Sequence, residues 1–378
     1  MKVILRTALL LLLIVLVPLA CSSGGGNGDG DNGPAFRSFV YVTNWGTSYV
    51  SAFAIDESTG NLTKISGSPF TVGSVPTSIA IVPAGTFAFV TNEDSSTISI
   101  MRINPVTGAL TESTDSPYDT GSNPISSAVD PTGKYLYTLS WIPGRLFAYR
   151  IDGTTGGLSP IAGSPYGTGA DPHFLAIDPS GRFIYAVNIS SNNVSVFSID
   201  ASTGALTEIA GSPFDTGEWP NSIVIDPAGK HLYMAVYSSN YVASYGIDQA
   251  SGVLTELAGS PVQGGSQPWA TAIDPAGKFV YVTNTTNDGN NRTVSGYTVD
   301  TATGLLSEMP GSPFTASWAP YSVAVDRTGK FAYVANNGTG DVSAFTIDSV
   351  TGRLMPLTAS PFKVVQNPTY ITTVRIKQ

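Results

Sequence analysis

A single unit repeats seven times along this chain, with a period of 48 residues. Each copy after the first contains an apolar run that usually ends in Asp-Pro, a turn with Gly and two further apolar runs. A Thr-Gly or similar turn and a last run before Gly-Ser-Pro, or a near copy of it, complete the unit. A unit of this length cannot bury its apolar residues alone, so the copies must pack against one another. The clearest column is aromatic in every copy, and only its last interval is longer, at 52 residues: Tyr41, Phe89, Tyr137, Tyr185, Tyr233, Tyr281 and Tyr333.

The copy that starts at Asn221 shows why each unit should form four strands. Pro227-Ala228-Gly229 suits a tight turn, because Pro presets φ and Gly relieves crowding, and Ser251-Gly252 suits a second reversal. The sequence predicts strands over Ser222 to Asp226, His231 to Val236, Val242 to Asp248 and Val253 to Ala258. Four antiparallel strands in 48 residues are typical of one propeller blade. We therefore predict an all-β, seven-bladed β-propeller over residues 37–378.

The two ends of the repeat array predict how the ring closes. The first copy begins at Phe39 to Val42 with its second strand and lacks a first strand of its own. At the other end, Tyr370 to Ile376 follows Asn367-Pro368 as other first strands follow their Pro. We expect this C-terminal strand to complete the N-terminal blade, which would leave no open sheet edge.

The N-terminus predicts export. Lys2 and Arg6 precede an apolar run from Ala8 to Ala20 that is short for a permanent membrane helix. The run ends in Val17-Pro18-Leu19-Ala20-Cys21, which resembles a bacterial lipoprotein cleavage box. We expect residues 1–21 to be a lipoprotein signal peptide with Cys21 as the lipidation site, and residues 22–36 to be a flexible tether. Ordinary signal cleavage and an uncleaved anchor are the alternatives.

This reading predicts an exported lipoprotein of the bacterial cell envelope, in the outer membrane or facing the periplasm, that touches the membrane only through its anchor. The chain carries a net charge of −9, or −11 without Lys2 and Arg6, which opposes nucleic-acid binding. Two His and one Cys exclude a His/Cys zinc cage, and neither a phosphate-binding Gly loop nor a Gly-x-Ser-x-Gly elbow occurs. We expect a monomer without metal or cofactor.

Two columns vary between copies and lie where first strands begin and second strands end, on one face of the predicted propeller. Columns that repeat serve every blade, whereas columns that vary can serve a ligand. All five tryptophans fall on this face, as does an insertion around Asn287 to Asn291. Amphipathic rings at a channel mouth suit a small polar ligand. The predicted ligand-binding residues are Trp45, Trp141, Asp171, Trp219, Asn221, Tyr237, Trp269, Trp318 and Tyr321. The alternative is that these rings pack between blades as core.

Two sets of motifs resemble known families. Tyr-Val-Thr-Asn at residues 41–44 and 281–284 and the Asp-Pro-x-Gly-Lys turns resemble the YVTN-repeat propellers. The Thr-Gly-x-Leu and Gly-Ser-Pro-Phe repeats resemble, more narrowly, the lactonase family of seven-bladed propellers, which includes 6-phosphogluconolactonase and carboxymuconate-cyclising enzymes. The resemblance covers residues 37–378.

The lactonase resemblance implies a role for one histidine. Asp171-Pro172-His173-Phe174 resembles the family segment whose histidine faces the active-site cleft, so His173 is the predicted general base, with Glu93 as a second catalytic residue. The family's arginine and glutamate have no counterpart, since Pro220-Asn221-Ser222 and Val236-Tyr237 stand at the matching positions. Lactone opening also needs a group that stabilises the developing oxyanion.

Three hypotheses follow. The first is a lipid-anchored, extracytoplasmic lactonase-like propeller that binds a small polar ligand, a sugar or lactone, or a partner protein on its Trp-rich face. The second is an active lactone hydrolase that uses His173 and Glu93. The third is a protein-interaction scaffold without a small-molecule site.

Overall fold

A computed structural model describes residues 36–285 and 292–378, which contain thirty-five β-strands and no helix. Cys21, the tether up to residue 35 and the insertion around Asn287 to Asn291 lie outside the described residues. Within the described ranges, no helix has the length and apolar character needed to cross a membrane. The first strand begins at Phe36, which the predicted tether included.

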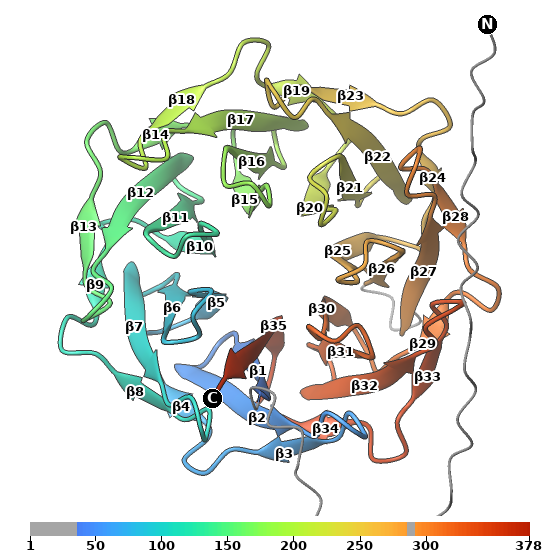
Figure 1. Cartoon of the computed structure of the whole chain (residues 1–378), viewed down its shortest axis with the longest axis horizontal. Coiled ribbons are helices and arrows are strands. Elements are labelled where there is room, and N and C mark those ends of the chain that lie inside the picture. Colours follow the sequence, from blue (N-terminus) through green and yellow to red (C-terminus); the bar gives the residue numbers. More distant parts are fainter. Residues whose placement is uncertain (1–35, 286–291) are drawn as a thin grey trace, which may run out of the picture. The chain divides into compact units, whose positions relative to one another are not determined.

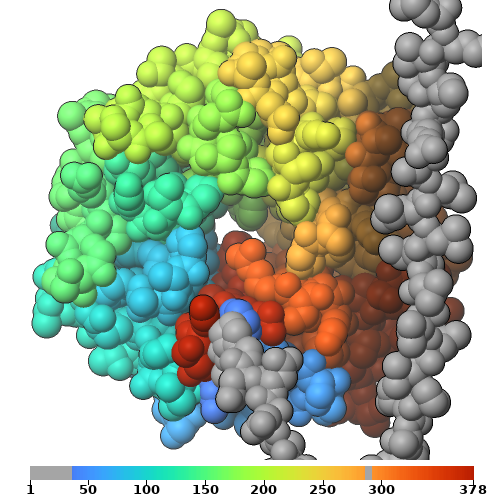
Figure 2. Space-filling model, viewed as in Figure 1, coloured from blue at the N-terminus to red at the C-terminus, as the bar shows by residue number. Residues whose placement is uncertain are grey.

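The strands form seven antiparallel sheets arranged around a central opening (Figures 1 and 2), so the predicted seven-bladed propeller is confirmed. The innermost strands are β35 (Pro368–Lys377), β5 (Pro76–Ile81), β10 (Pro124–Val129), β15 (Pro172–Ile177), β20 (Pro220–Ile225), β25 (Pro268–Ile273) and β30 (Pro320–Val325). The second strands are β1 (Phe36–Asn44), β6 (Phe87–Asn92), β11 (Tyr135–Ser140), β16 (Phe183–Asn188), β21 (His231–Val236), β26 (Phe279–Asn284) and β31 (Phe331–Asn336). We number the blades from 1 to 7 in the order of these second strands.

The third and fourth positions complete each blade, and the fourth is divided into two short strands. The third strands are β2 (Tyr49–Ile55), β7 (Thr97–Ile103), β12 (Arg145–Ile151), β17 (Asn193–Ile199), β22 (Tyr241–Ile247), β27 (Thr293–Val299) and β32 (Asp341–Ile347). The first outer pieces are β3 (Leu62–Lys64), β8 (Leu110–Glu112), β13 (Leu158–Pro160), β18 (Leu206–Glu208), β23 (Leu254–Glu256), β28 (Leu306–Glu308) and β33 (Leu354–Pro356). The second outer pieces are β4 (Phe70–Thr71), β9 (Tyr118–Asp119), β14 (Tyr166–Gly167), β19 (Phe214–Asp215), β24 (Val262–Gln263), β29 (Phe314–Thr315) and β34 (Phe362–Lys363).

The outer strand is divided at the Gly-Ser-Pro repeat and its near copies. The role of the serine explains why this motif recurs in every blade. Where the outer strand is interrupted, one N–H of the third strand has no backbone partner. The serine supplies one, as when Ser212 Oγ accepts the N–H of Val196 at 2.9 Å. An unpaired backbone donor would cost free energy, so every blade uses the same solution. The serines are Ser68, Ser116, Ser164, Ser212, Ser260, Ser312 and Ser360.

The ring closes as the sequence predicts, because β35 pairs antiparallel with β1 from Phe36↔Lys377 to Thr43↔Tyr370. A bidentate ion pair secures the same closure: Arg375 Nη2 lies 3.0 Å from Glu57 Oε2, and Arg375 Nε donates to Glu57 Oε1 at 3.1 Å. Chain ends separated by more than three hundred residues therefore share one sheet.

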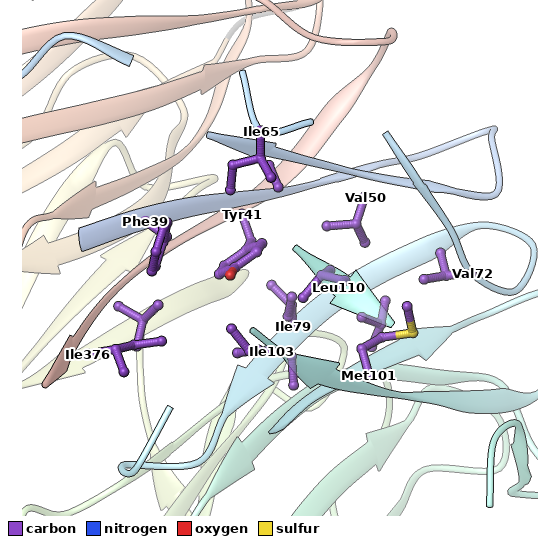
Figure 3. Close-up of a cluster of buried hydrophobic side chains, with 14 residues drawn as sticks. Phe39, Tyr41, Val50, Ile65, Val72, Ile79, Met101, Ile103, Leu110 and Ile376 are labelled. Carbon is purple, nitrogen blue, oxygen red and sulfur yellow. The ribbon is translucent and has the colours of Figure 1, made fainter. Parts of the chain in front are cut away.

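Apolar side chains fill the space between neighbouring blades. Figure 3 shows one such cluster, in which Phe39 and Tyr41 of β1 and Ile376 of β35 meet Met101 and Leu110 of the next blade. The aromatic column is fully buried, and most of its tyrosines donate to a glycine carbonyl of the next blade: Tyr41 to Gly108, Tyr137 to Gly204, Tyr185 to Gly252, Tyr281 to Gly352 and Tyr333 to Gly60. This column is thus a repeated bond between blades.

The Asp-Pro turns lie at the opposite end of the first strands from the variable columns. In blade 4, Asp178 Oδ1 accepts the N–H groups of Arg182 and Phe183, each at 2.7 Å, and Asp178 Oδ2 accepts that of Ser180 at 3.1 Å. Asp130 makes the same set of bonds. His231, next to such a turn, places Nδ1 2.9 Å from Asp226 Oδ2 and is buried. These turns hold the blade together.

Candidate functional site

Every first strand carries a bulge just after its inter-blade proline. In blade 4, Pro172 pairs with Asn188 and Phe174 with Val187, which leaves His173 unpaired. The pairing of the first strand with the second is irregular at the same place in the other six blades. A bulge redirects side chains and breaks the simple alternation of a strand. Consequently, two successive residues of each first strand reach the channel.

A second repeated bond brings the two variable columns together. The residue after each second strand donates its N–H to the carbonyl of the residue before the inter-blade proline; in blade 5, Tyr237 N lies 2.9 Å from Trp219 O. Most residues that supply this carbonyl have a positive φ, including Asp171 (φ 51) and Trp219 (φ 58). The seven pairs are Trp45–Asn367, Glu93–Val75, Trp141–Asn123, Ile189–Asp171, Tyr237–Trp219, Thr285–Gln267 and Asn337–Ala319.

These loops surround a cavity of about 530 Å³ at the channel mouth. The predicted site residues that line it are Trp45, Glu93, Trp141, Asp171, His173, Trp219, Asn221, Tyr237, Trp269 and Tyr321. Trp318 is the exception. It precedes Pro320 by two residues, whereas Trp219 precedes Pro220 by one, and its ring lies over Gly338 outside the cavity lining.

A connected row of aromatic rings forms one side of the cavity. Trp219 stacks on Tyr237 at 6.0 Å between ring centroids, and Tyr237 meets the edge of Trp269 at 5.6 Å. Trp269 in turn lies 5.0 Å from Tyr321 and 5.8 Å from His173. We call Trp219, Tyr237, Trp269 and Tyr321 the aromatic wall. None of the four is fully buried, so the wall offers ring surface to the cavity.

Two carboxylates lie in different surroundings at this site. Asp171 is held on both oxygens, since Trp141 Nε1 donates to Oδ1 at 3.0 Å and Ser190 Oγ donates to Oδ2. Glu93 is half-buried, and burial together with the neighbouring Asp94 charge raises the pKa of its carboxyl, against a hydrogen bond from Trp45. Asp171 therefore positions Trp141, and Glu93 is the carboxyl with capacity left for a ligand.

His173 is neutral at ordinary pH. Burial in the channel lowers its pKa from 6.5 to about 4, and the charge of Asp171 opposes this shift. A neutral imidazole can accept a proton, but a pKa near 4 makes it a weak base at pH 7.

The cavity contains no positive charge. No Lys or Arg occurs among its lining residues. In the part of the chain that the structure describes, no three His, Cys, Asp or Glu side chains gather as metal ligands. The cavity thus offers ring faces, carboxyl and amide oxygens, and hydroxyl groups.

The sequence reasoning missed a second ring of residues, directly after the variable column of the first strands. Alternation would turn these residues away from the channel, but the bulge turns them toward it. They are Ser78, Ser126, Phe174, Ser222, Ala270, Ser322 and Tyr370. Only their position next to the variable column could have indicated them. Thr285, which follows the second strand of blade 6, does not line the cavity.

Asn221 lines the cavity, and one atom of its side chain has no hydrogen-bond partner. Its Nδ2 donates to Trp269 O at 2.8 Å, and its Oδ1 is buried without a donor. A buried acceptor without a partner costs about 1–3 kcal/mol.

Comparison with known proteins places these features in a family. The sequence profile described as "Lactonase, 7-bladed beta-propeller" matches residues 35–125, 124–215, 214–269 and 258–373. No protein of curated function matches.

Solved structures show the same fold. A candidate 6-phosphogluconolactonase from Bacteroides uniformis is 18% identical, with a TM-score of 0.77 over 89% of this chain and 99% of its own. One from Bacteroides fragilis is 20% identical, with a TM-score of 0.77 over 92% of this chain and 100% of its own. The periplasmic gluconolactonase of Pseudomonas aeruginosa is 19% identical, with a TM-score of 0.74 over 90% of this chain and 99% of its own. At these identities the likeness establishes the fold alone.

Proposed function

Because this chain belongs to the family of seven-bladed β-propeller lactonases, we propose that its cavity binds an uncharged sugar or sugar lactone. The observation that carries the proposal is the aromatic wall, which faces a cavity lined by two carboxylates and by no Lys or Arg. We further propose that the protein is exported and held at the cell envelope by a lipid on Cys21, on the strength of its N-terminal sequence.

The chemistry of the cavity suits a sugar ring. The apolar C–H face of a sugar can pack on the rings of Trp269 and Tyr237, which are large apolar surfaces with polar edges. Its hydroxyl groups can donate to the carboxylate of Glu93. Apolar walls with a few convergent polar groups are the usual composition of a small-ligand site.

The charge of the lining residues makes a phosphorylated ligand unsuitable for this cavity. Phosphate groups are held by Arg, Lys or clustered backbone N–H groups. The lining of this cavity provides neither basic residue, and Glu93 and Asp171 would repel an anion. The ligand therefore differs from the phosphorylated substrate in the names of the Bacteroides proteins.

Lactone hydrolysis is the second candidate, favoured by the family and by the position of His173 in the cavity. Here His173 would take a proton from water while the water oxygen attacks the lactone carbonyl. The ring C–O bond would then break, and its oxygen would receive the proton held by His173, which gives the open hydroxy acid and restores the neutral imidazole. The low pKa of His173 and the absence of Lys and Arg from the lining, which leaves no cation to stabilise the oxyanion, both argue for a slow reaction.

Calorimetric titration with neutral sugars, glucono-lactone and 6-phosphogluconate tests the proposal. We expect the neutral compounds to bind and the phosphorylated one not to bind. Trp269→Ala should weaken binding at least tenfold, because it removes the centre of the aromatic wall. Met355→Ala, an exposed residue on the outer strand β33, is the matched control and should bind like the parent chain.

Two results would contradict the proposal. The first is preferred binding of the phosphorylated compound. The second is capture of a partner protein through the Trp-rich face without any sugar binding. Hydrolysis of glucono-lactone above the buffer rate, lost in His173→Ala, would establish the second candidate.

A further inference from the structure

The tryptophans of this face extend beyond the cavity. Four of them are strongly exposed: Trp45 by 48%, Trp141 by 44%, Trp219 by 52% and Trp318 by 40%. Large apolar rings exposed together mark a binding surface more often than chance. Trp318 is outside the cavity lining, so a ligand confined to the cavity does not use it.

These exposed rings are held in place. Trp141 Nε1 donates to Asp171, and the ring of Trp219 stacks on Tyr237 while its backbone N–H donates to Asn192 Oδ1 at 2.9 Å. The backbone of Trp219 has a φ of 58°, a conformation that bulky residues rarely adopt. Rigid aromatic rings lose little conformational entropy when they bind.

Trp318 packs against a glycine of the neighbouring loop, Gly338. The N–H of Gly338 donates to Trp318 O at 3.2 Å, and a Cβ at Gly338 would come within 2.6 Å of the Trp318 ring. A glycine at this position therefore lets the indole lie flat against the neighbouring loop. Trp318 precedes β30 and Tyr321 lies in β30, so Trp318 lies at the same end of blade 7 as Tyr321 of the aromatic wall.

The dimensions and charge of the site limit what can cover this surface. At about 530 Å³ the cavity lies within the range of about 300–1,000 Å³ that holds drug-sized ligands, which are larger than one sugar ring. The lining has no basic residue to pair with an anionic chain. A neutral chain of several sugars satisfies both limits, with rings inside the cavity and rings on the rim.

We infer that the site takes the end of an uncharged oligosaccharide, with the terminal sugar against Trp269 and later sugars on Tyr321 and Trp318. This inference rests on the proposed function, since it names the class of sugar that the cavity binds. In this inference Trp318 contributes to the affinity for oligosaccharides and not to the affinity for a single sugar.

Titration with neutral oligosaccharides of one to five units, from the maltose and cellobiose series, tests the inference. We expect affinity to rise at least tenfold between one and three units and then to level off. Trp318→Ala should lose at least fivefold for three or more units and less than twofold for the single sugar. Trp318→Phe should recover part of the loss, and Met355→Ala should change nothing.

The outcomes separate the inference from the proposed function. Equal affinity for all lengths, or no effect of Trp318→Ala on longer chains, overturns the inference and leaves the sugar site intact. Absence of binding to every sugar overturns both. Melting temperatures of the variants, expected to match the parent because Trp318 is exposed, separate lost contacts from lost folding.

Discussion

The two faces of the propeller are built from loops of the same seven repeats, yet they differ in what repeats. On the face of the Asp-Pro turns, both backbone and side chains recur, as in the matching bonds of Asp130 and Asp178. On the cavity face the backbone bonds recur and the side chains change from Glu93 to Trp141 to Tyr237. Repeated side chains thus mark what every blade needs for stability, and varied side chains on a constant backbone mark the binding site.

The largest effect should come from removing the closing strand. Truncation after Asn367 deletes β35 with its full pairing to β1 and its ion pair to Glu57, which exposes a buried sheet edge. We expect a chain without cooperative thermal unfolding by circular dichroism. Deletion of Gln378 alone, an exposed residue beyond β35, is the control. A folded truncated chain would show that blade 1 does not need its first strand.

A smaller effect separates the two faces directly. Asp178→Ala leaves three backbone N–H groups without their acceptor, so we expect a loss of about 2–4 kcal/mol in the free energy of unfolding, measured with urea. Trp141→Ala on the cavity face should cost about 1 kcal/mol or less, because the ring is exposed. Equal losses in the two variants would remove the distinction between a stabilising face and a binding face.

A further expected effect is a pH dependence of stability that only the cavity face should show. The pKa of His173 is lowered from 6.5 to about 4, so the folded state binds fewer protons than the unfolded state. Above pH 6.5 the histidine is neutral in both states, so it does not change the free energy of unfolding. As the pH drops toward 4 the unfolded state takes up a proton first, and the free energy of unfolding should fall on the order of 2 kcal/mol. His173→Asn should flatten the curve over this interval. Identical curves for both proteins would show that His173 does not titrate in this way.

The repeated features were predictable because local rules repeat with them. The tyrosine column, the Asp-Pro turns and the missing first strand of blade 1 are each visible in the printed sequence, and together they predict the ring. The division of the fourth strand was not predicted, although Gly-Ser-Pro recurs, because a serine that replaces a backbone partner leaves no sign in strand alternation.

The details of the site depend on irregularities of the backbone, which the alternation of side chains along a regular strand does not reveal. The bulge at His173 brings Phe174 to the channel as well, which period-two reasoning excludes. Trp219 and Trp318 look equivalent as inter-blade tryptophans, yet one residue of offset from the proline separates cavity from rim. The low pKa of His173 arises in a channel shared with Trp269, which lies two blades away.

The bond between Tyr237 N and Trp219 O, with its counterparts in every blade, has a consequence for how such a protein changes over evolutionary time. Each blade satisfies its own backbone at the two positions that carry specificity, so the side chains there are free to be exchanged one at a time. A descendant of this chain can therefore acquire a different ligand by point substitution, with no loop to lengthen and no blade to rebuild.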